Sequence, residues 1–400
     1  MVGPDGKARV TFVSLEIFTP DLGAPRGLEQ AIRKLNRDYP WVVEAGWDVE
    51  YWGLRRAGAG PTRDPRYRAR GLPLPAAARL PSVVAMPLAW LVQGVLALRA
   101  RTGTVLVAHT PRSAAGVVLA RRVSRRASQP LVVRVQSRAS SRARLVTKSE
   151  ARARWIERIE GQALEQADLV LPMGDFTRSY SLSQGARPAR VVTLPFPVGW
   201  DGPLPDGLVA VTRDPMRVTC AARLQPEKGV DVLLRAIALV AEAFPGVVLD
   251  IAGNGPERPR LVALASELGI SGNVRFRGWL APADMPAFYA GSAVSVLPSL
   301  VEEGFGMSLI EAGLVGCALV GTDHGGIPDI VVPGRTGLLV APGDSAALGQ
   351  ALGRLLGDPK WAASLGAGAM VEAQRYVSQR AAAIAEVRRR MAALVPASAH

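Results

Sequence analysis

Residues 218–251 read VTCAARLQPEKGVDVLLRAIALVAEAFPGVVLDI, and this stretch decides the fold class. The apolar run at 218–221 predicts a short buried strand, and the run at 247–251 predicts a second one. Between them, apolar side chains such as Leu233 and Ile237 recur at helical spacing and predict a helix with one buried face. A strand, a helix and a second strand in this order are typical of parallel β-sheets covered by helices.

The same rhythm recurs along most of the chain, as expected of parallel sheets that are buried on both faces. In the first half, the predicted strands are 10–13, 49–52, 104–108, 131–135, 169–171 and 191–194. In the second half, they are 218–221, 247–251, 274–276, 294–297, 318–320 and 338–340. The chain therefore belongs to the α/β class.

A proline-rich segment at 195–215 interrupts this rhythm and is typical of a connection between domains. We therefore predict an N-terminal Rossmann-like domain at 1–198, a linker at 199–216 and a second Rossmann-like domain at 217–372. Residues 373–400 are predicted to form a C-terminal helix that could pack back on the N-terminal domain. Because doubly wound sheets bind ligands beyond the carboxyl ends of their strands, we expect the two domains to face each other across a cleft that holds the site.

Composition excludes several classes of protein. The chain has 400 residues, of which 48% are apolar and 20% charged, so it is long and apolar enough to fold as two domains. Its two cysteines, Cys220 and Cys317, lie in apolar stretches and predict buried thiols rather than a disulfide framework. Residues 80–98 are uncharged but interrupted by Pro and Gln, which favours a core helix over a membrane span. The N-terminus lacks a secretory signal, so we expect a cytoplasmic protein.

Positive charge is concentrated in the first half of the chain. The net charge is +14, and residues 1–198 contain 31 Lys and Arg against 15 Asp and Glu. The segment 121–154 alone has eleven basic residues and one acid, Glu150. Such a segment can be a solvated face, or it can attract phosphorylated or lipid-linked acceptors or the anionic inner face of a membrane. Nucleic acid is not predicted as a partner, because aromatic residues are absent from this segment.

The most informative chemical pattern is SLVEEGFGMSLIEAGLV at 299–315. Glu303 and Glu311 stand eight residues apart, so Glu303 is expected in a loop and Glu311 about one and a half turns inside the helix that follows. Gly304 and Gly306 allow the backbone to approach a ligand closely, and the first N–H groups of a helix can receive an anion. Both carboxylates could then face one polar ligand.

The run E-G-F-G-x-S-x-x-E-A at 303–312 resembles the E-x7-E signature of retaining glycosyltransferases of family 4, which have the two-domain GT-B fold. Three further motifs resemble the same family in the same order. ARLQPEKG at 222–229 is similar to its R-L-x-x-x-K-G segment, GNGP at 253–256 to its G-x-G-P turn, and GGIP at 325–328 to its G-G-x-P loop. The resemblance covers nearly all of 217–344 and, more loosely, the first domain.

This resemblance implies a retaining glycosyltransferase of carbohydrate biosynthesis that moves a hexose-type sugar from a UDP- or GDP-linked donor to an acceptor hydroxyl. It implies that Arg223 and Lys228 stabilise the departing diphosphate, that Glu303 accepts hydrogen bonds from the sugar, and that Glu311 holds the ribose. The other donor-binding residues implied are Gly304, Phe305, Gly306, Met307, Ser308, Gly253, Arg277 and Trp279. On the acceptor or sugar side, the candidates are Gly23, Gly27, His109 and Gln136.

No Asp-x-Asp triplet occurs in the sequence, so we predict that no metal or other cofactor is needed. Paired cations, Arg223 and Lys228, are a physically consistent substitute for Mg²⁺ at the diphosphate. The donor is thus expected as a nucleotide sugar, and the acceptor as a small molecule, a glycan or a lipid-linked molecule held by the N-terminal domain.

Two alternatives remain open at this point. Many family members have a histidine at the position of Gln136, and the first loop around Gly23 and Gly27 departs from the family's Gly-Gly pattern. These departures would suit a catalytically silent GT-B protein that binds a glycan or a partner. The second alternative is a peripheral membrane protein in which the basic segment 121–154 is the main functional feature.

Overall fold

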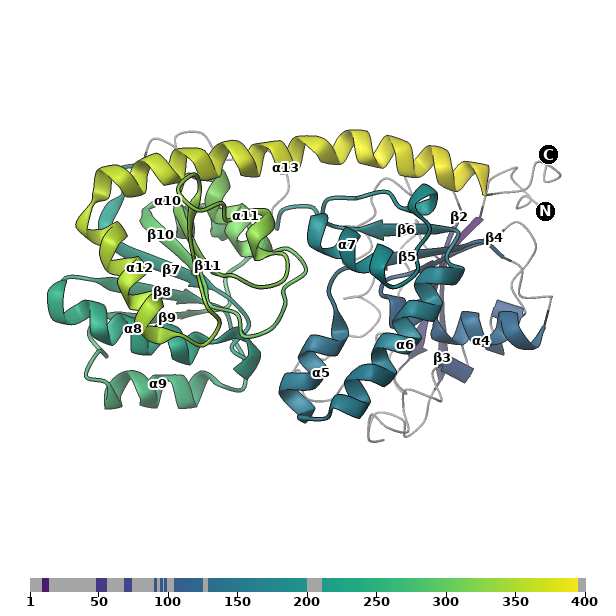
Figure 1. Cartoon of the computed structure of the whole chain (residues 1–400), viewed down its shortest axis with the longest axis horizontal. Coiled ribbons are helices and arrows are strands. Elements are labelled where there is room, and N and C mark those ends of the chain that lie inside the picture. Colours follow the sequence, from purple (N-terminus) through teal and green to yellow (C-terminus); the bar gives the residue numbers. More distant parts are fainter. Residues whose placement is uncertain are drawn as a thin grey trace. The chain divides into compact units, whose positions relative to one another are not determined.

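The computed structural model describes residues 9–13, 48–55, 68–73, six residues between 90 and 98, 104–124, 129–199 and 211–394. The chain forms two compact units, each built around a parallel six-stranded sheet with helices packed against it (Figure 1). The first unit contains Met1–Ser140, Glu150–Pro195 and Arg380–His400, and the second contains Ser141–Ser149 and Phe196–Gln379.

The sheet of the first unit has the strand order β3-β2-β1-β4-β5-β6. Its strands are β1 Arg9–Val13, β2 Asp48–Arg55, β3 Arg68–Pro73, β4 Thr104–Ala108, β5 Leu131–Val135 and β6 Leu169–Pro172. The helical elements are η3 Pro111–Ala114, α4 Ala115–Val123, α5 Ala139–Thr147, α6 Glu150–Gln166, α7 Asp175–Ser183 and η4 Pro188–Arg190. Strands β4, β5 and β6 are buried along their whole length, Arg134 of β5 included, as expected of a parallel sheet that is covered on both faces.

Two details of this sheet differ from the sequence-based expectation. Strand β3 was not predicted, because Arg68 and Arg70 break its apolar pattern. The strand expected at 191–194 is wrong, since only Val191 forms an isolated bridge, to Val170. Residues 192 and 194 still donate backbone hydrogen bonds to β6, but the prolines that follow at 195 and 197 have no N–H with which to extend the ladder.

The sheet of the second unit has the order β12-β11-β10-β7-β8-β9. Its strands are β7 Asp214–Ala221, β8 Val248–Ala252, β9 Val274–Gly278, β10 Ser292–Leu297, β11 Ala318–Thr322 and β12 Gly337–Val340, which confirms all six predicted strands. The helices are α8 Val230–Ala243, α9 Arg258–Glu267, α10 Met285–Ala290, α11 Met307–Leu314, α12 Ser345–Gly357 and α13 Pro359–Ala393. Three short 3-10 helices complete the unit, η6 Pro226–Lys228, η7 Pro282–Asp284 and η8 Ile327–Asp329.

Helix α13 begins at Pro359, earlier than the expected start at 373, and its residues from Arg380 onward group with the first unit. The connection predicted at 199–216 includes residues 200–210, which lie outside the described residues. Strand β7 begins at Asp214, inside that predicted connection.

Both sheets have the same doubly wound order, which places the first strand of each unit beside its fourth. In the second unit these neighbours are β7 and β10. Doubly wound folds bind their ligands beyond the carboxyl ends of the strands, at the point where the strand order reverses. The fold therefore directs attention to the carboxyl ends of β7 and β10.

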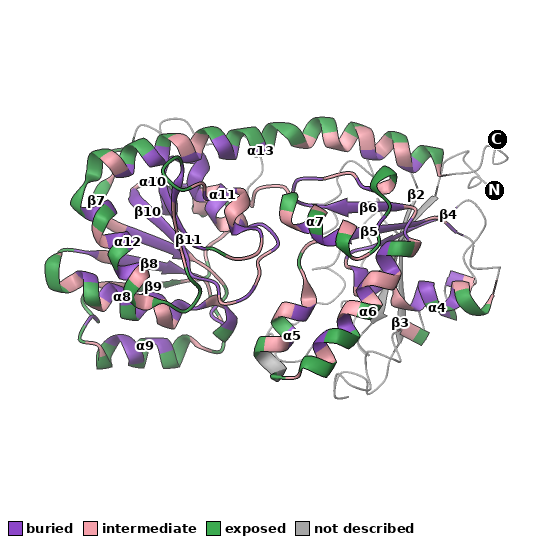
Figure 2. Cartoon of the chain, in the orientation of Figure 1, coloured by how far each residue is buried: buried purple, intermediate pink, exposed green. Residues whose placement is uncertain are grey.

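The core of each unit is apolar and closely follows the predicted strands and helix faces (Figure 2). In the second unit, α8 buries Leu233 and Ile237 against the sheet, as their spacing predicts. Cys220 and Cys317 are buried free thiols, and burial raises the pKa of each to about 12. At neutral pH both are protonated and serve as small apolar side chains.

The segment 80–98 is described only in part, and its described residues 90–91, 94–95 and 97–98 are helical. Gly94 packs against α4, where an added Cβ would lie 3.1 Å from the carbonyl oxygen of Gly116. Within the described residues, we find no helix with the length and apolar character needed to cross a bilayer.

Candidate active site

The four motifs selected from the sequence all leave the same edge of the second sheet. They follow β7, β8, β10 and β11, four adjacent strands that run parallel. Because the carboxyl ends of parallel strands lie at one edge, loops that are distant in sequence are brought together there. The glycines of these motifs show how closely the loops pack.

The loop after β8 packs against the loop after β7. Gly253 has φ 129°, and a Cβ at this position would lie 1.9 Å from the carbonyl oxygen of Ala222. At Gly255 an added Cβ would lie 2.1 Å from the carbonyl oxygen of Leu224, whose N–H donates to Asn254 at 3.0 Å. Only glycine permits this approach, so the G-x-G-P turn supports the loop that carries Arg223.

The loop after β11 supports the loop after β10 in the same way. The N–H of Gly326 donates to the carbonyl oxygen of Glu303 at 2.8 Å, and Gly325, with φ 61°, forms a bridge with Glu303. A Cβ at Gly326 would lie 2.3 Å from the carbonyl oxygen of Gly304. The G-G-x-P loop therefore fixes the backbone on which Glu303 stands.

The loops after β7 and β10 meet at the point where the strand order reverses. Leu300 donates its N–H to the carbonyl oxygen of Glu227 at 2.9 Å, and a Cβ at Gly229 would lie 2.1 Å from the carbonyl oxygen of Pro298. Between these backbone contacts, the Lys228 ammonium lies 2.5 Å from the Glu303 carboxylate. The structure thus brings together a cation and an anion that the sequence analysis selected from separate motifs.

The pair is partly shielded from water, with 14% of the Lys228 side chain and 18% of the Glu303 side chain exposed. The hydroxyl of Ser299 also donates to the Glu303 carboxylate. Sequence reasoning missed Ser299, since a serine just after a strand has no distinguishing signal of its own. The Ser299 hydroxyl and the Lys228 ammonium together hold the carboxylate in one orientation.

Arg223 stands on the same loop as Lys228. Its carbonyl oxygen accepts from the N–H of Gln225 at 2.9 Å, which fixes the turn, and its side chain is exposed. Among the residues that the structure describes, the guanidinium has no hydrogen bond or ion pair. This cation is available to an incoming anion without first breaking another contact.

Glu303 lies in the loop before α11 and Glu311 inside the helix, as predicted. Gly306 caps the helix with φ 85°, a conformation that favours glycine. The Glu311 carboxylate accepts from the N–H of Gly199 at 2.9 Å and from the hydroxyl of Tyr289 at 3.4 Å. These two hydrogen bonds orient the Glu311 carboxylate.

Burial, followed by the nearby Glu311 carboxylate, raises the pKa of Tyr289 well above its ordinary value, so the hydroxyl remains a donor. Neither Tyr289 nor Gly199 was selected from the sequence, because both are distant from Glu311 along the chain. The first turn of α11 includes Met307 and Ser308, whose backbone N–H groups have no partner inside the helix.

Arg277 is engaged elsewhere in the second unit. Its Nε donates to the buried Asp250 carboxylate at 2.6 Å, and Nε of Arg217 donates to the other carboxylate oxygen at 2.7 Å. Trp279 is 69% exposed. Within the described part of the chain, neither Arg277 nor Trp279 has a hydrogen bond or ion pair to Lys228 or Glu303.

The first unit contains the remaining candidates. His109 directly follows β4 and is buried, and Gln136 directly follows the neighbouring strand β5. Nε2 of Gln136 is buried, with no hydrogen-bond partner among the described residues. Gly23 and Gly27 lie outside the described residues.

The first unit also holds a buried carboxyl group that the sequence did not reveal. Glu160 on α6 is 1% exposed, and it accepts from the hydroxyl of Tyr180 at 2.6 Å. Burial raises the pKa of Glu160 to about 7, although the Tyr180 hydrogen bond and the Arg112 charge act in the opposite direction. The guanidinium Nε of Arg112 lies 4.0 Å from the carboxylate.

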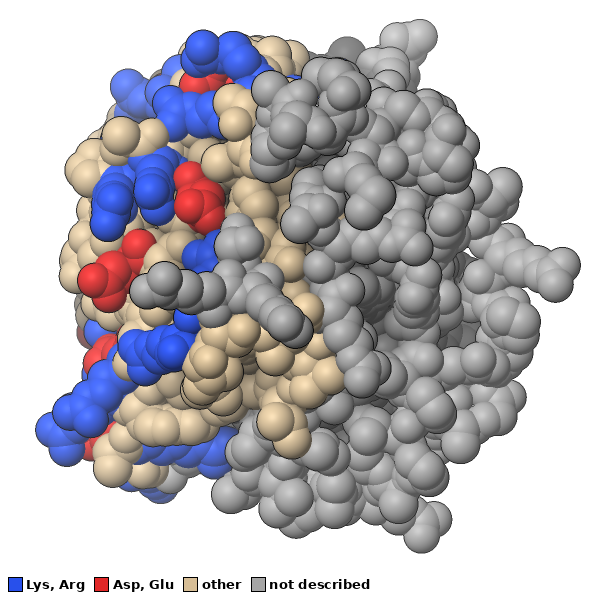
Figure 3. Space-filling model, turned by 90° about the vertical axis from the view of Figure 1, so that its right-hand side faces the viewer, with Lys and Arg blue, Asp and Glu red and all other residues tan. Residues whose placement is uncertain are grey.

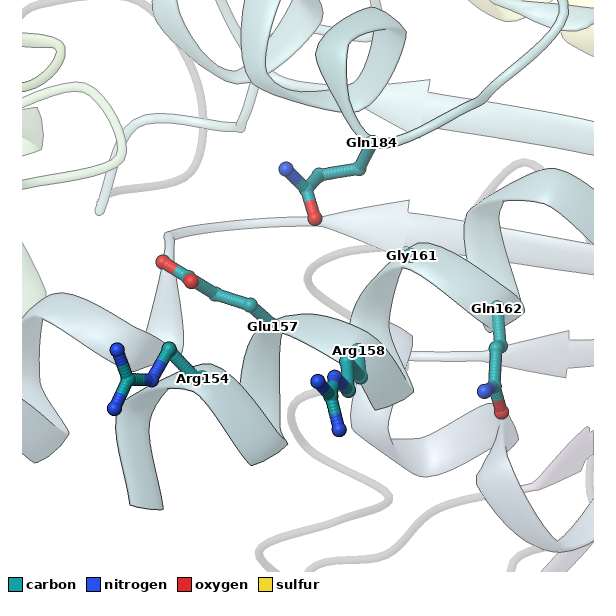
Figure 4. Close-up of a pocket in the computed structure, with 6 residues that line it drawn as sticks. All are labelled: Arg154, Glu157, Arg158, Gly161, Gln162 and Gln184. Atoms are coloured by element: carbon teal, nitrogen blue, oxygen red, sulfur yellow. The ribbon is translucent and has the colours of Figure 1, made fainter. Parts of the chain in front are cut away.

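A hollow of about 410 Å³ lies along α6 of the first unit (Figure 4). It is lined by Arg154, Glu157, Arg158, Gly161, Gln162 and Gln184. Arg154 is the last residue of the basic segment 121–154, and the other five were not selected from the sequence. Glu157 is paired with Arg138 at 2.7 Å. Lys and Arg gather on the described part of one face of the molecule, with fewer acids between them (Figure 3).

Two doubly wound units, with four glycine-containing loops gathered at the edge of the second sheet, define the class of glycosyltransferases with the GT-B fold. Residues 26–197 match the family described as "Glycosyl transferase 4-like domain", and residues 210–370 match "Glycosyl transferases group 1". The chain belongs to the family 4 glycosyltransferases.

Curated relatives match part of the chain. It is 34% identical over 213 residues to the GDP-mannose-dependent alpha-(1-6)-phosphatidylinositol monomannoside mannosyltransferase of Mycolicibacterium smegmatis, covering 50% of this chain and 56% of that protein. It is 37% identical over 177 residues to the D-inositol 3-phosphate glycosyltransferase of Streptomyces scabiei, covering 42% and 40%. The chain thus spans about half the length of the curated relatives it matches.

Solved structures share the fold over nearly the whole chain. The sucrose-phosphate synthase of Thermosynechococcus elongatus superposes with a TM-score of 0.76 at 22% identity, covering 96% of this chain and 99% of that one. HepE of Anabaena, in complex with UDP and glucose, superposes with a TM-score of 0.66 at 19% identity, covering 95% and 99%. At these identities the likeness concerns the fold.

Proposed function

We propose that this chain is a retaining glycosyltransferase that moves a hexose-type sugar from a nucleoside diphosphate donor to an acceptor hydroxyl. The observation that carries the proposal is the contact between Lys228 and Glu303 at the reversal of strand order, on loops that the four family motifs support. The family membership and the nucleotide-sugar enzymes among the relatives support the same reading.

In the proposed reaction, the bond between the anomeric carbon and the diphosphate oxygen breaks while the acceptor oxygen bonds to the same face of the sugar. The proton of the acceptor hydroxyl passes to the departing phosphate oxygen. Lys228 and Arg223 neutralise the charge that develops on the diphosphate, and a preorganised group of this kind contributes about 3–4 kcal/mol to lowering the barrier. When the diphosphate binds, the Lys228 ammonium turns from Glu303 toward the phosphate or is shared between them.

The acids hold the donor at two points. Glu303, oriented by Ser299, accepts from sugar hydroxyls, and Glu311, oriented by Gly199 and Tyr289, accepts from the ribose. The first N–H groups of α11 donate to the donor, because a helix N-terminus favours negative charge. Trp279, with an open ring face, is proposed to lie against the base.

The names of related proteins support the proposed class of donor. A mannosyltransferase relative is named as GDP-mannose-dependent, and a structural neighbour was solved with UDP-glucose. We propose a UDP- or GDP-hexose donor and catalysis without a metal, since Arg223 and Lys228 can supply the positive charge. Turnover should then persist in excess EDTA.

The acceptor is proposed to bear a phosphate. One relative is named for D-inositol 3-phosphate and another for a phosphatidylinositol glycolipid. The first 198 residues have an excess of basic residues, and Arg154 and Arg158 line the hollow on α6, where Gln162 and Gln184 offer amides to hydroxyls. D-inositol 3-phosphate and phosphatidylinositol monomannoside are therefore the first two acceptors to supply.

We further propose a cytoplasmic enzyme that associates peripherally with an anionic membrane face. Trp155 is 44% exposed between Arg154 and Arg158, and an exposed aromatic ring among arginines suits a lipid headgroup region. Sedimentation with vesicles of phosphatidylcholine, with and without phosphatidylglycerol, tests this point. Binding to the anionic vesicles alone, weakened by salt, is expected, and equal binding to both would overturn it.

The decisive experiment for the proposed function is a donor panel. GDP-mannose, UDP-glucose and UDP-N-acetylglucosamine are supplied with each acceptor, and release of nucleoside diphosphate is measured. Lys228→Ala and Glu303→Ala should abolish release, whereas the surface variant Arg260→Ala should not. A wild-type chain that binds a donor but never releases nucleoside diphosphate would instead be the silent GT-B protein.

A further inference from the structure

One peptide group, between Pro195 and Phe196, is held at both of its polar atoms by side chains of α13. The N–H of Phe196 donates to the hydroxyl oxygen of Tyr376 at 2.7 Å, and the Arg380 guanidinium donates to the carbonyl oxygen of Pro195. Tyr376 and Arg380 are one helical turn apart. This peptide group also marks the boundary between the two compact units, which falls between 195 and 196 and again between 379 and 380.

Tyr376 has a second set of contacts, with the loop that precedes α11. Its ring stacks on Phe305, with centroids 4.3 Å apart and an interplanar angle of 20°. Its hydroxyl lies 3.8 Å from Sδ of Met307. Tyr376 is 7% exposed and Phe305 is 5% exposed, so the stacked pair is shielded from water.

The loop needs such a support because of its glycines. Gly304 and Gly306 flank Phe305, and glycine loses more backbone freedom on ordering than any other residue. A stacked aromatic pair contributes about 0.5–1.5 kcal/mol beyond its buried area. The stacked Tyr376 ring therefore restricts the backbone conformations open to the glycine-flanked residue Phe305.

The connecting segment, here residues 195–199, also contacts helix α11 directly. The N–H of Gly199 donates to the Glu311 carboxylate on α11 at 2.9 Å, and a Cβ on Gly199 would lie 2.6 Å from that carboxylate oxygen. Gly199 is thus tied to α11 directly, and Phe196 is tied to the loop at Phe305 through Tyr376. Tyr376 is the side chain shared between the connection and the loop.

We propose that Tyr376 is a positioning residue for donor binding, which holds Phe305, Gly306 and Met307 in place and couples them to the connecting segment at Phe196. The inference rests on the proposed role of this loop in holding the donor, and it assigns no contact between Tyr376 and the donor. The Tyr376 ring holds the loop by stacking on Phe305, and the Tyr376 hydroxyl accepts the hydrogen bond from the N–H of Phe196.

Calorimetric titration of the full chain with GDP and with UDP tests the proposal, together with donor KM and kcat. Tyr376→Ala removes both contacts and should raise the Kd of the bound nucleotide and the donor KM about three- to tenfold, with a smaller change in kcat. Tyr376→Phe keeps the ring and should restore most of the affinity. Phe305→Ala should match Tyr376→Ala, and the double variant should be no worse than either single variant.

A buried residue of the same helix provides the control. Leu365 is 1% exposed and packs in the apolar core of the second unit, so Leu365→Ala lowers stability without touching the loop. At a temperature where all variants are folded, Leu365→Ala should bind nucleotide as the wild type does. Equal nucleotide affinity in Tyr376→Ala and wild type, or an equal loss in Leu365→Ala, overturns the positioning role alone. A wild-type chain that binds neither GDP nor UDP overturns the proposed function, and this inference with it.

Discussion

Lys228 and Glu303 belong to different motifs, yet their side chains meet at 2.5 Å on two loops that are joined backbone to backbone. The pair leaves this part of the site electrically balanced before any ligand arrives. In the proposed reaction a diphosphate adds negative charge next to a carboxylate, so we expect its binding to depend on how far Lys228 and Arg223 compensate both anions. The contact between Lys228 and Glu303 is therefore the first relationship to test.

Substitution of Lys228 or Glu303 should lower both stability and turnover, but only the loss of stability should be partly relieved when both residues are substituted. Lys228→Met leaves the half-buried Glu303 carboxylate without its cation and should lower the free energy of unfolding by about 1–3 kcal/mol, as should Glu303→Gln. The double variant should be less destabilised than the sum of the two. Turnover should stay reduced by about a hundredfold or more in all three, since Lys228→Met removes a cation from the diphosphate and Glu303→Gln weakens the proposed hold on the sugar hydroxyls.

The exposed pair Arg260 and Glu257, at 2.6 Å, is the matched control for this cycle. Double-mutant analysis there should yield about 0.2–1 kcal/mol of coupling and no effect on turnover. Urea unfolding and nucleoside diphosphate release are measured on the same samples. Normal turnover in the double variant of Lys228 and Glu303 would show that neither of these two residues takes part in the reaction.

Gly326→Ala should disturb the active-site loop. The added Cβ would lie 2.3 Å from the carbonyl oxygen of Gly304, so the backbone below Glu303 must move. We expect a donor KM raised about tenfold or more and a lower melting temperature. Gly272→Ala is the control, because no atom lies within 4 Å of its added Cβ, and it should leave the donor KM unchanged.

Arg277→Ala should act on stability rather than on the donor. Arg277 and Arg217 together balance the fully buried Asp250 carboxylate, so loss of Arg277 should cost about 1–3 kcal/mol of unfolding free energy. The donor KM is expected within about twofold of the wild type. An unchanged unfolding curve with a tenfold higher donor KM would place Arg277 on the nucleotide, as the family resemblance implies.

Glu160 should make stability depend on pH. Its pKa is about 7 in the folded chain, against an ordinary value of 4.5, so between these values the folded chain keeps a proton that the unfolded chain has released. The free energy of unfolding therefore falls as the pH rises from about 4.5 to about 7, by roughly 3 kcal/mol from this group. The stabilisation is complete below that window and lost above it.

Glu160→Gln should remove this dependence, because the amide imitates the protonated acid and still accepts from Tyr180. Urea unfolding at pH 5 and pH 8 measures the difference, and Glu165→Gln, at an exposed position of the same helix, should behave as the wild type. A Glu160→Gln variant with the wild-type difference between the two pH values would show that another group is responsible.

Much of the architecture was predictable because it depends on local patterns. Short runs that are mostly apolar, such as those of β5 and β10, identified buried parallel strands, and the spacing of Leu233 and Ile237 identified the inner face of α8. Strand β3 was not predicted because arginines interrupt its apolar pattern. The strand predicted at 191–194 does not form because prolines follow it at 195 and 197. The length of α13 was underestimated because its alanine- and glycine-rich start lacks a clear apolar face.

The candidate site was predictable only where chemistry and spacing coincide. Glu303 and Glu311 were found in their expected loop and helix, and Lys228 in the loop after β7. Ser299, Tyr289 and Gly199 orient these acids through single hydrogen bonds across long stretches of sequence, and no local pattern marks such residues. Arg277 was selected by resemblance, but the buried Asp250 that binds it lies on the neighbouring strand and is visible only in three dimensions.

The close packing of glycines between neighbouring loops has a consequence for engineering. The turn after β8 fits only the backbone of the loop after β7, and the turn after β11 fits only that of the loop after β10. Replacing one loop with that of a relative that uses another donor should therefore disrupt the packing between the two loops, whereas replacing both loops of a packed pair should preserve that packing. Loop exchanges that aim to alter sugar specificity should therefore replace both loops of a pair.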